Sequence, residues 1–181
     1  MTQVSQAPEV GDMVAIERAA AGQARLARLE SSDGVELRRF FYRLSPETIY
    51  RRFHSPLARP EQAQPARLLD IDHRDREAVV AVLDGEIIGV ARYARRPGTD
   101  SAEVAVVVAD AWHREGLATK MLGALSELAE AAGIRQFTLS MQADNRGALH
   151  LLHRFHPDAA LTHSQGIYQA TVPVPRSHRW A

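Results

Sequence analysis

The segment AEVAVVVADAWHREGLATKMLG, residues 102–123, contains the residues of this chain whose types and spacing have the clearest chemical meaning. A run of valines ends at Ala109 and Asp110, a polar turn follows, and Gly116 precedes a segment rich in alanine and leucine. A helix start leaves about four backbone N–H groups without partners and carries partial positive charge. Small residues such as Gly116 and Ala118 let a bulky anion approach that backbone closely. The pattern predicts a turn that holds a phosphate chain.

Two familiar phosphate-binding motifs do not fit this turn. A Walker loop has several glycines followed by Lys and then Ser or Thr, whereas Thr119 and Lys120 stand in the reverse order. A dinucleotide fingerprint has spaced glycines that are missing here. Taken alone, Gly116 is equally consistent with a tight strand-to-helix turn that binds nothing.

The turn resembles part of a known family when it is taken with the residues around it. Residues 102–122 together with MQADNRGALHLLHRF (141–155) resemble the acetyl-CoA-binding core of the GNAT superfamily of N-acetyltransferases. That family's pattern is Gln or Arg, two residues, Gly, one residue, then Gly or Ala; Gly116 and Ala118 match, and His113 stands where Gln or Arg is usual. Residues 38–56 and 70–82 also resemble the acetyltransferase domains of bacterial protein-lysine acetyltransferases, so the resemblance covers roughly residues 35–172.

The resemblance implies acetyl-CoA as the acetyl donor and a set of residues that bind it. The backbone of the last valines should pair with the pantetheine arm like an added strand, and the amides of the turn should cradle the pyrophosphate. Asn145 matches the family asparagine that contacts CoA, although a plain helix cap is the alternative. The expected cofactor-binding residues are Val106, Val107, Val108, His113, Arg114, Glu115, Gly116, Leu117, Ala118, Thr119 and Asn145.

Acetyl transfer to an amine requires a neutral amine, and a lysine-like pKa of ~10.4 disfavours that form by about 4 to 5 kcal/mol at pH 7. A positioned base therefore has value. Glu103 is the only acid between Asp100 and Asp110 and stands where the resembling lysine acetyltransferases carry their glutamate base. We predict that Glu103 is the general base, acting through a water; a strand-edge glutamate that only faces solvent is the alternative. Because the chain has no cysteine, we expect direct attack on the thioester in a ternary complex.

Two positions depart from the family pattern, one where a general acid is common and one that affects how the acceptor is bound. Many GNAT enzymes place a tyrosine seven residues after the motif asparagine to protonate the thiolate, and that position here is Leu152. His156 stands where a glycine usually precedes the last strand pair. His150 and His153 lie about 60° apart on a helix, but without an evident third ligand we expect no metal site.

The elements that must position these residues follow from periodicity and turn signals. Asp33 and Ser45-Pro46 are typical of helix starts, and Asp84-Gly85 between two β-branched runs predicts a hairpin. Strands are expected at 102–109, 134–142 and 168–174, and helices at 116–132 and from a cap at Asp144 or Asn145 to about 155. Residues 24–30 are open between strand and helix, residues 13–21 suggest a short helix, and residues 54–65 suggest a loop.

This order predicts an α/β (α+β) sandwich whose mixed, mostly antiparallel central sheet has helices on both faces. We expect a flexible segment at 1–22, an acetyltransferase domain at 23–174 and a tail at 175–181. An arginine cluster on the two early helices is read as a solvated face, with an acidic acceptor as the alternative. The cluster comprises Arg38, Arg39, Arg43, Arg51 and Arg52.

Composition limits the partners. The 181 residues carry 22 basic and 22 acidic side chains and are 45% hydrophobic, so no overall charge favours nucleic acid or an anionic membrane. Without a membrane-length apolar run or a signal-like start, a cytoplasmic protein is the default expectation. We predict an N-acetyltransferase acting on a protein lysine or a small-molecule amine, with homodimerisation open. The competing classes are a non-catalytic CoA-binding module on the same fold and a nucleotide-binding protein.

Overall fold

The computed structural model describes residues 24–54 and 65–175. Its sheet has the order β1-β2-β3-β4-β5-β7-β6, and every neighbouring pair is antiparallel except the parallel pair β4 and β5. The strands are β1 (Arg25–Arg28), β2 (Arg76–Leu83), β3 (Glu86–Arg95), β4 (Ser101–Val108), β5 (Gln136–Gln142), β6 (Thr162–Ser164) and β7 (Ile167–Pro173). The helices are α1 (Gly34–Tyr42), α2 (Pro46–Phe53), α3 (Pro65–Leu68), α4 (Leu117–Ala131) and α5 (Arg146–Phe155).

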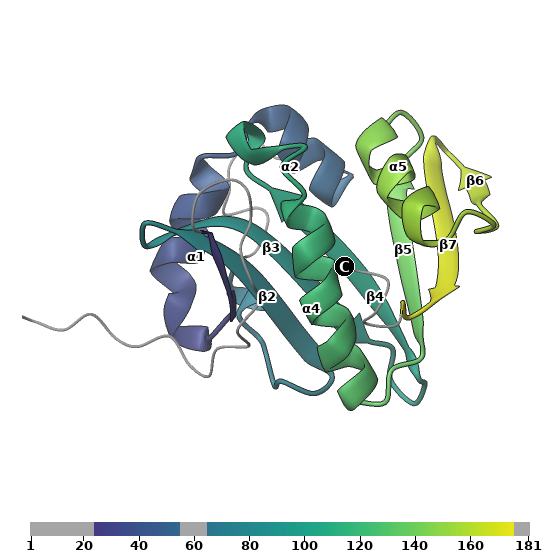
Figure 1. The fold of residues 1–181 in the computed structure, drawn as a ribbon, viewed down its shortest axis with the longest axis horizontal. Coiled ribbons are helices and arrows are strands. Elements are labelled where there is room, and N and C mark those ends of the chain that lie inside the picture. Colours follow the sequence, from purple (N-terminus) through teal and green to yellow (C-terminus); the bar gives the residue numbers. More distant parts are fainter. Residues whose placement is uncertain (1–23, 55–64, 176–181) are drawn as a thin grey trace, which may run out of the picture.

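Helices cover both faces of the sheet, as predicted (Figure 1). One core lies between the sheet and α4 and α5, and includes Met121, Leu125 and Leu152. The other lies between the sheet and α1 to α3, and includes Phe40, Phe41 and Ile49. The predicted mixed, mostly antiparallel α/β fold is confirmed.

Most predicted elements are present with small shifts at their ends. Residues 24–30, for which the sequence did not decide between strand and helix, contain strand β1, which pairs with β2. The hairpin turns at Asp84 and Gly85, whose φ angles are 49° and 81°, and Ser45 caps α2 by accepting a hydrogen bond from the Thr48 amide. Strand β6 and the short helix α3 were not predicted, because each has fewer residues than a periodic pattern needs.

Helix α4 lies close against the strands beneath it. Leu117, Met121 and Leu125, which recur every four residues, are all buried. Gly89 on β3 leaves room for the end of the Met121 side chain, because a Cβ atom there would lie 2.7 Å from Met121 Cε. The β4–α4 turn is therefore fixed against the sheet by a well-packed helix.

Strands β4 and β5 pair along only part of their length. The parallel register covers Ser101 to Glu103 of β4 opposite Gln136 to Thr138 of β5. Beyond Glu103, β4 keeps its antiparallel partner β3 up to Val108, while β5 continues beside β7. The sheet therefore splits after Glu103, and Figure 1 shows α4 and α5 on either side of this split.

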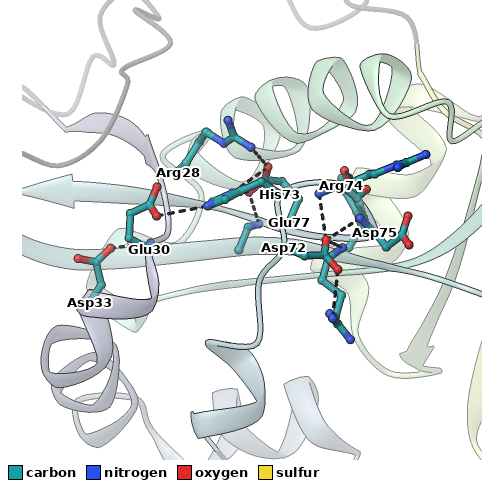
Figure 2. Close-up of polar contacts among 11 residues, drawn as sticks. Arg28, Glu30, Asp33, Asp72, His73, Arg74, Asp75 and Glu77 are labelled. Carbon is teal, nitrogen blue, oxygen red and sulfur yellow. Dashed lines mark hydrogen bonds and ion pairs between the residues drawn. The ribbon is translucent and has the colours of Figure 1, made fainter.

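A buried carboxylate holds the first strand to the sheet. Glu77 of β2 is 1% exposed, and its carboxylate accepts hydrogen bonds from Arg28 of β1 and, at 3.0 Å, from His73 Nδ1. The other ring nitrogen of His73 lies 3.2 Å from Glu30 (Figure 2). Because each partner sits on a different segment, the network ties β1, the turn after it and the loop before β2 together.

Several predictions fall outside the described residues. These are the flexible segment 1–22, the short helix over 13–21, most of the loop predicted at 54–65, and residues 176–181 of the predicted tail. Within the described residues, no helix has both the length and the apolar character that crossing a membrane requires.

Candidate functional site

The turn between β4 and α4 presents backbone amides that have no protein partner. Arg114 and Gly116 both adopt positive φ angles, 67° and 77°. Across residues 24–54 and 65–175, the amides of residues 114–119 donate no hydrogen bond, whereas the next amide, that of Lys120, bonds the Gly116 carbonyl at 3.1 Å. Adjacent unpaired amides at a helix start form a concave anion site. The predicted residues Arg114, Glu115, Gly116, Leu117, Ala118 and Thr119 are thus brought together.

The split leaves one edge of β4 without a strand beside it. In the β3–β4 ladder the Ala109 amide bonds the Ile88 carbonyl, and hydrogen-bonded pairs alternate along antiparallel strands. Val107 therefore directs its backbone toward β3, whereas Val106 and Val108 direct theirs toward the split. Of the predicted residues Val106, Val107 and Val108, the first and last offer backbone groups to an extended arm.

His113 uses its hydrogen-bonding groups inside the protein. Its Nε2 donates to the Val108 carbonyl at 2.9 Å, and its backbone amide donates to the Asp110 carbonyl at 3.3 Å. The ring therefore ties the start of the turn to the end of β4. The predicted contact of His113 with the cofactor would therefore use its other ring nitrogen, Nδ1.

Asn145 caps helix α5 and keeps a free donor group. Its Oδ1 accepts a hydrogen bond from the Ala148 amide at 3.1 Å and lies 3.5 Å from Arg51 Nη1 of α2. Within the described part of the chain its amide nitrogen makes no hydrogen bond. The capping role and a ligand-binding role are therefore compatible, because they use different atoms of one side chain.

Glu103 is an exposed residue where the sheet splits. It lines a cleft of about 500 Å³ together with Thr138, Ser140 and Thr171 on β5 and β7, and with Arg96. The strand around it is apolar, as the sequence indicated, but the cleft is polar. Its carboxylate is therefore open to water and to a ligand in the cleft.

Glu103 acts electrostatically on Arg52, which belongs to the predicted arginine cluster, and on Arg92 and His54, which the sequence did not single out. Arg92 of β3 and Arg52 of α2 are both partly buried. His54, which follows α2 with a φ of 53°, places its Nε2 3.2 Å from Ser140 Oγ. Burial and then the charge of Arg52 lower the pKa of His54, so its ring is neutral at pH 7. The alternation of β3 could have revealed Arg92, because it follows the buried Val90 by two residues.

Leu152 lies in the core and contributes nothing to the site, because it is 6% exposed and packed with α4 and the sheet. His156 caps the C-terminal end of α5. His150 and His153 are exposed on α5. The residues that the structure describes contain no group of three or more metal-ligating side chains.

Asp110 joins helix α2 to the turn. Its carboxylate accepts hydrogen bonds from the Ser45 amide at 3.0 Å, the Ser45 hydroxyl at 2.6 Å and the Thr48 hydroxyl at 2.8 Å. Although burial acts in the opposite direction, these hydrogen bonds lower the pKa of Asp110 below its usual 3.8. The start of α2 is therefore fixed to the start of the β4–α4 turn.

We expect Asp110→Asn to lower the free energy of unfolding by about 1 kcal/mol at pH 7, a small effect because the carboxylate is largely exposed. A lowered native pKa means that the ionised carboxylate stabilises the fold above the unfolded-state value of about 3.8. That contribution is lost as the pH falls through the native pKa. Urea unfolding between pH 6 and 3 should therefore show a weaker acid dependence in Asp110→Asn; an identical dependence would contradict this role.

The family model and the two curated relatives that this chain matches below are all acetyltransferases. The acetyltransferase (GNAT) family model matches residues 38–156. An acetyltransferase of Pseudomonas aeruginosa is 34% identical over 122 residues, which is 65% of this chain and 66% of that protein. Acetyltransferase Pat of Mycolicibacterium smegmatis is 29% identical over 134 residues, 72% of this chain and 40% of that protein.

Among solved structures, the GNAT domain of S. lividans PAT superposes with a TM-score of 0.77 at 25% identity, covering 86% of this chain and 93% of that domain. The chain spans less than two thirds of the length of each of these two curated relatives. The family model nevertheless covers more than half of the chain, and the split sheet and the turn lie within that match. The chain belongs to the acetyltransferase (GNAT) family.

Proposed function

We propose that this protein is an acetyl-CoA-dependent N-acetyltransferase that moves an acetyl group to a primary amine, either a protein lysine or a small molecule. The observation that supports this best is the continuous open edge of β4. Unpartnered amides at residues 114–119 stand at one end of it and the carboxylate of Glu103 at the other. Membership of the family supports the choice of donor.

The donor would lie along this edge. Its diphosphate would accept hydrogen bonds from the turn amides, which have no competing partner in the described residues. The backbones of Val106 and Val108 would bond the amides of the pantetheine arm, and Asn145 would offer its free amide nitrogen. From Val108 to Glu103 β4 extends about 17 Å at the usual rise per residue, so the thioester end would come to lie near Glu103.

The chemistry then requires one acyl transfer and the loss of two protons from the acceptor nitrogen. Glu103, through a water in the cleft, would take the first proton from the acceptor ammonium. The neutral nitrogen would attack the thioester carbonyl carbon and form the N–C bond. It would lose its second proton to solvent as the C–S bond breaks. No protein acid is assigned to the departing thiolate, because Leu152 is buried in the core; solvent serves, since a thiolate is a tolerable leaving group.

The competing function is a CoA-binding module without catalysis. The absence of an acid at Leu152 and the internal use of the His113 ring favour it. The exposed carboxylate of Glu103 in a polar cleft favours catalysis. Both functions predict binding of acetyl-CoA, so only turnover separates them.

The test is release of free thiol from acetyl-CoA in the presence of single amines and lysine peptides. We expect turnover with at least one acceptor and intersecting lines in double-reciprocal plots, as a ternary complex requires. Parallel lines would contradict direct attack. Tight acetyl-CoA binding without turnover on any acceptor would support the binding module, and tighter binding of ATP than of CoA would reject both.

A further inference from the structure

Two partly buried arginines on the Glu103 side of the sheet have no carboxylate bound to them. The other partly buried arginines are paired: Arg28 with Glu77, Arg51 with Glu47, Arg76 with Asp70 and Asp72, and Arg95 with Asp75. Within residues 24–54 and 65–175, Arg52 and Arg92 form no ion pair. A guanidinium that is half removed from water without a partner is costly, so the exception at these two positions calls for an explanation.

Arg92 lies on the same face of the sheet as Glu103 by strand register, and Arg52 reaches that face from α2. Arg92 of β3 stands opposite Ala105 of β4, and Glu103 follows two residues along β4 on the same face. Such diagonal neighbours are within reach of long side chains. Arg52 extends from α2 and, together with Arg92, lines a small cavity beneath that helix. Its guanidinium carbon lies 4.8 Å from the centre of the Phe53 ring, which fixes its direction.

Neither arginine has a carboxylate of its own. Glu103 acts electrostatically on both Arg52 and Arg92. Asp70 also acts on Arg92, from its ion pair with Arg76 at 3.2 Å. Burial and then the charge of Arg92 lower the pKa of Arg52 to about 10, so its guanidinium stays charged at pH 7. Two guanidinium groups thus stand near the base, and in the described residues neither forms an ion pair.

We propose that the acceptor is an amine that carries a carboxylate close to its amino group, and that Arg52 and Arg92 bind this carboxylate beside Glu103. Planar guanidinium groups bind carboxylates through paired, charge-assisted hydrogen bonds. The inference rests on the proposed acetyl transfer and names its acceptor class. A free amino acid and a lysine with an acidic neighbour in a peptide share this chemistry.

The two unpaired guanidinium groups disfavour purely cationic acceptors. An amine arrives protonated, and guanidinium groups near Glu103 repel it. A carboxylate on the acceptor offsets that repulsion and orients the amine toward the base. Polyamines and simple alkylamines should therefore be the poorest acceptors.

The first experiment compares acceptors that differ only in the carboxylate. Thiol release at saturating acetyl-CoA gives kcat/KM for lysine and for 1,5-diaminopentane, and for two lysine peptides that carry Glu or Gln beside the lysine. We expect the acceptor with the carboxylate to be preferred about 10- to 100-fold in at least one pair. The pair that shows the preference identifies a free amino acid or a peptide as the source of the carboxylate.

The second experiment removes the guanidinium groups one at a time. Arg92→Met and Arg52→Met should each reduce the preference for the carboxylate about tenfold or more, through the KM of the acceptor, while the KM for acetyl-CoA stays unchanged. Arg92→Lys, which keeps the charge but loses the paired hydrogen bonds, should give an intermediate value. Arg39→Met, at an exposed position on α1, is the control for the loss of one positive charge.

The outcomes separate this inference from the proposed function. Turnover with equal or better use of 1,5-diaminopentane and of the Gln peptide would overturn the acceptor class and leave acetyl transfer standing. A preference that survives in both methionine variants would overturn the assignment of Arg52 and Arg92. The absence of turnover on every acceptor would reject acetyl transfer itself. The wild-type comparison decides the acceptor class even if a variant fails to fold.

Discussion

Glu103→Gln should reduce kcat about 10²- to 10⁴-fold, the range of a positioned general base. Glutamine keeps the shape of the side chain but cannot accept the proton of the acceptor ammonium. Since Glu103 is exposed in the cleft and packs against no core, the fold and the KM for acetyl-CoA should not change. Thiol-release kinetics at saturating acetyl-CoA measure the effect.

The matched control is Glu86→Gln, another exposed glutamate, which pairs with Arg43 at the surface. Its kcat should stay within about twofold of wild type, because surface ion pairs contribute little. A Glu103→Gln variant whose rate lies within the same range would remove Glu103 from the mechanism. Such a result would leave the binding module as the better account of this chain.

Gly116→Val should weaken acetyl-CoA binding about 10- to 100-fold, which corresponds to ~1 to 3 kcal/mol. Gly116 has a φ of 77°, and a Cβ built on it meets no heavy atom within 4 Å. The added side chain would therefore fill only the space in front of the turn, where the diphosphate is expected. Titration calorimetry on the folded variant measures the loss.

Gly133→Val is the control for the backbone strain of this change. Gly133 lies beyond the other end of α4, has the same φ of 77°, and also has no heavy atom within 4 Å of the built Cβ. Both variants should lose stability to a similar extent, about 1 to 2 kcal/mol or somewhat more for a β-branched residue. Only Gly116→Val should lose affinity; an equal loss in both would show that strain, and not exclusion of the anion, is responsible.

The sequence predicted the fold well where a local signal is strong. The Asp84-Gly85 hairpin, the cap at Ser45 and the periodic face of α4 depend on residues close together in the chain. Residues 24–30 were left open because a four-residue strand has no reliable period, and its identity depends on the distant β2. The β5–β7–β6 edge likewise depends on pairing that the order of residues does not reveal.

The residues of the candidate site also fall into those with a local sequence signal and those without one. Gly116 and Ala118 could be predicted because they lie close together in the chain. The convergence of Arg52 and Arg92 on Glu103 could not, because it depends on the register of β3 with β4 and on the path of α2. The early arginines that looked like one solvated face divide in the structure, with Arg38 and Arg39 exposed and Arg52 partly buried.

The partial pairing of β4 and β5 also determines how this molecule can deform. The strands β1 to β4 with α4 form one arm and β5 to β7 with α5 form the other, and in the sheet the two arms join only from Ser101 to Glu103. Within the sheet, an opening of the arms pivots about this junction and grows with distance along β4. It also has to break the contacts that Arg51 and His54 make with Asn145 and Ser140 on the second arm. Glu103 stands at the pivot and the 114–119 turn at the far end. Entry of a long ligand can therefore widen the gap between the arms near the turn while the carboxylate of Glu103 hardly moves.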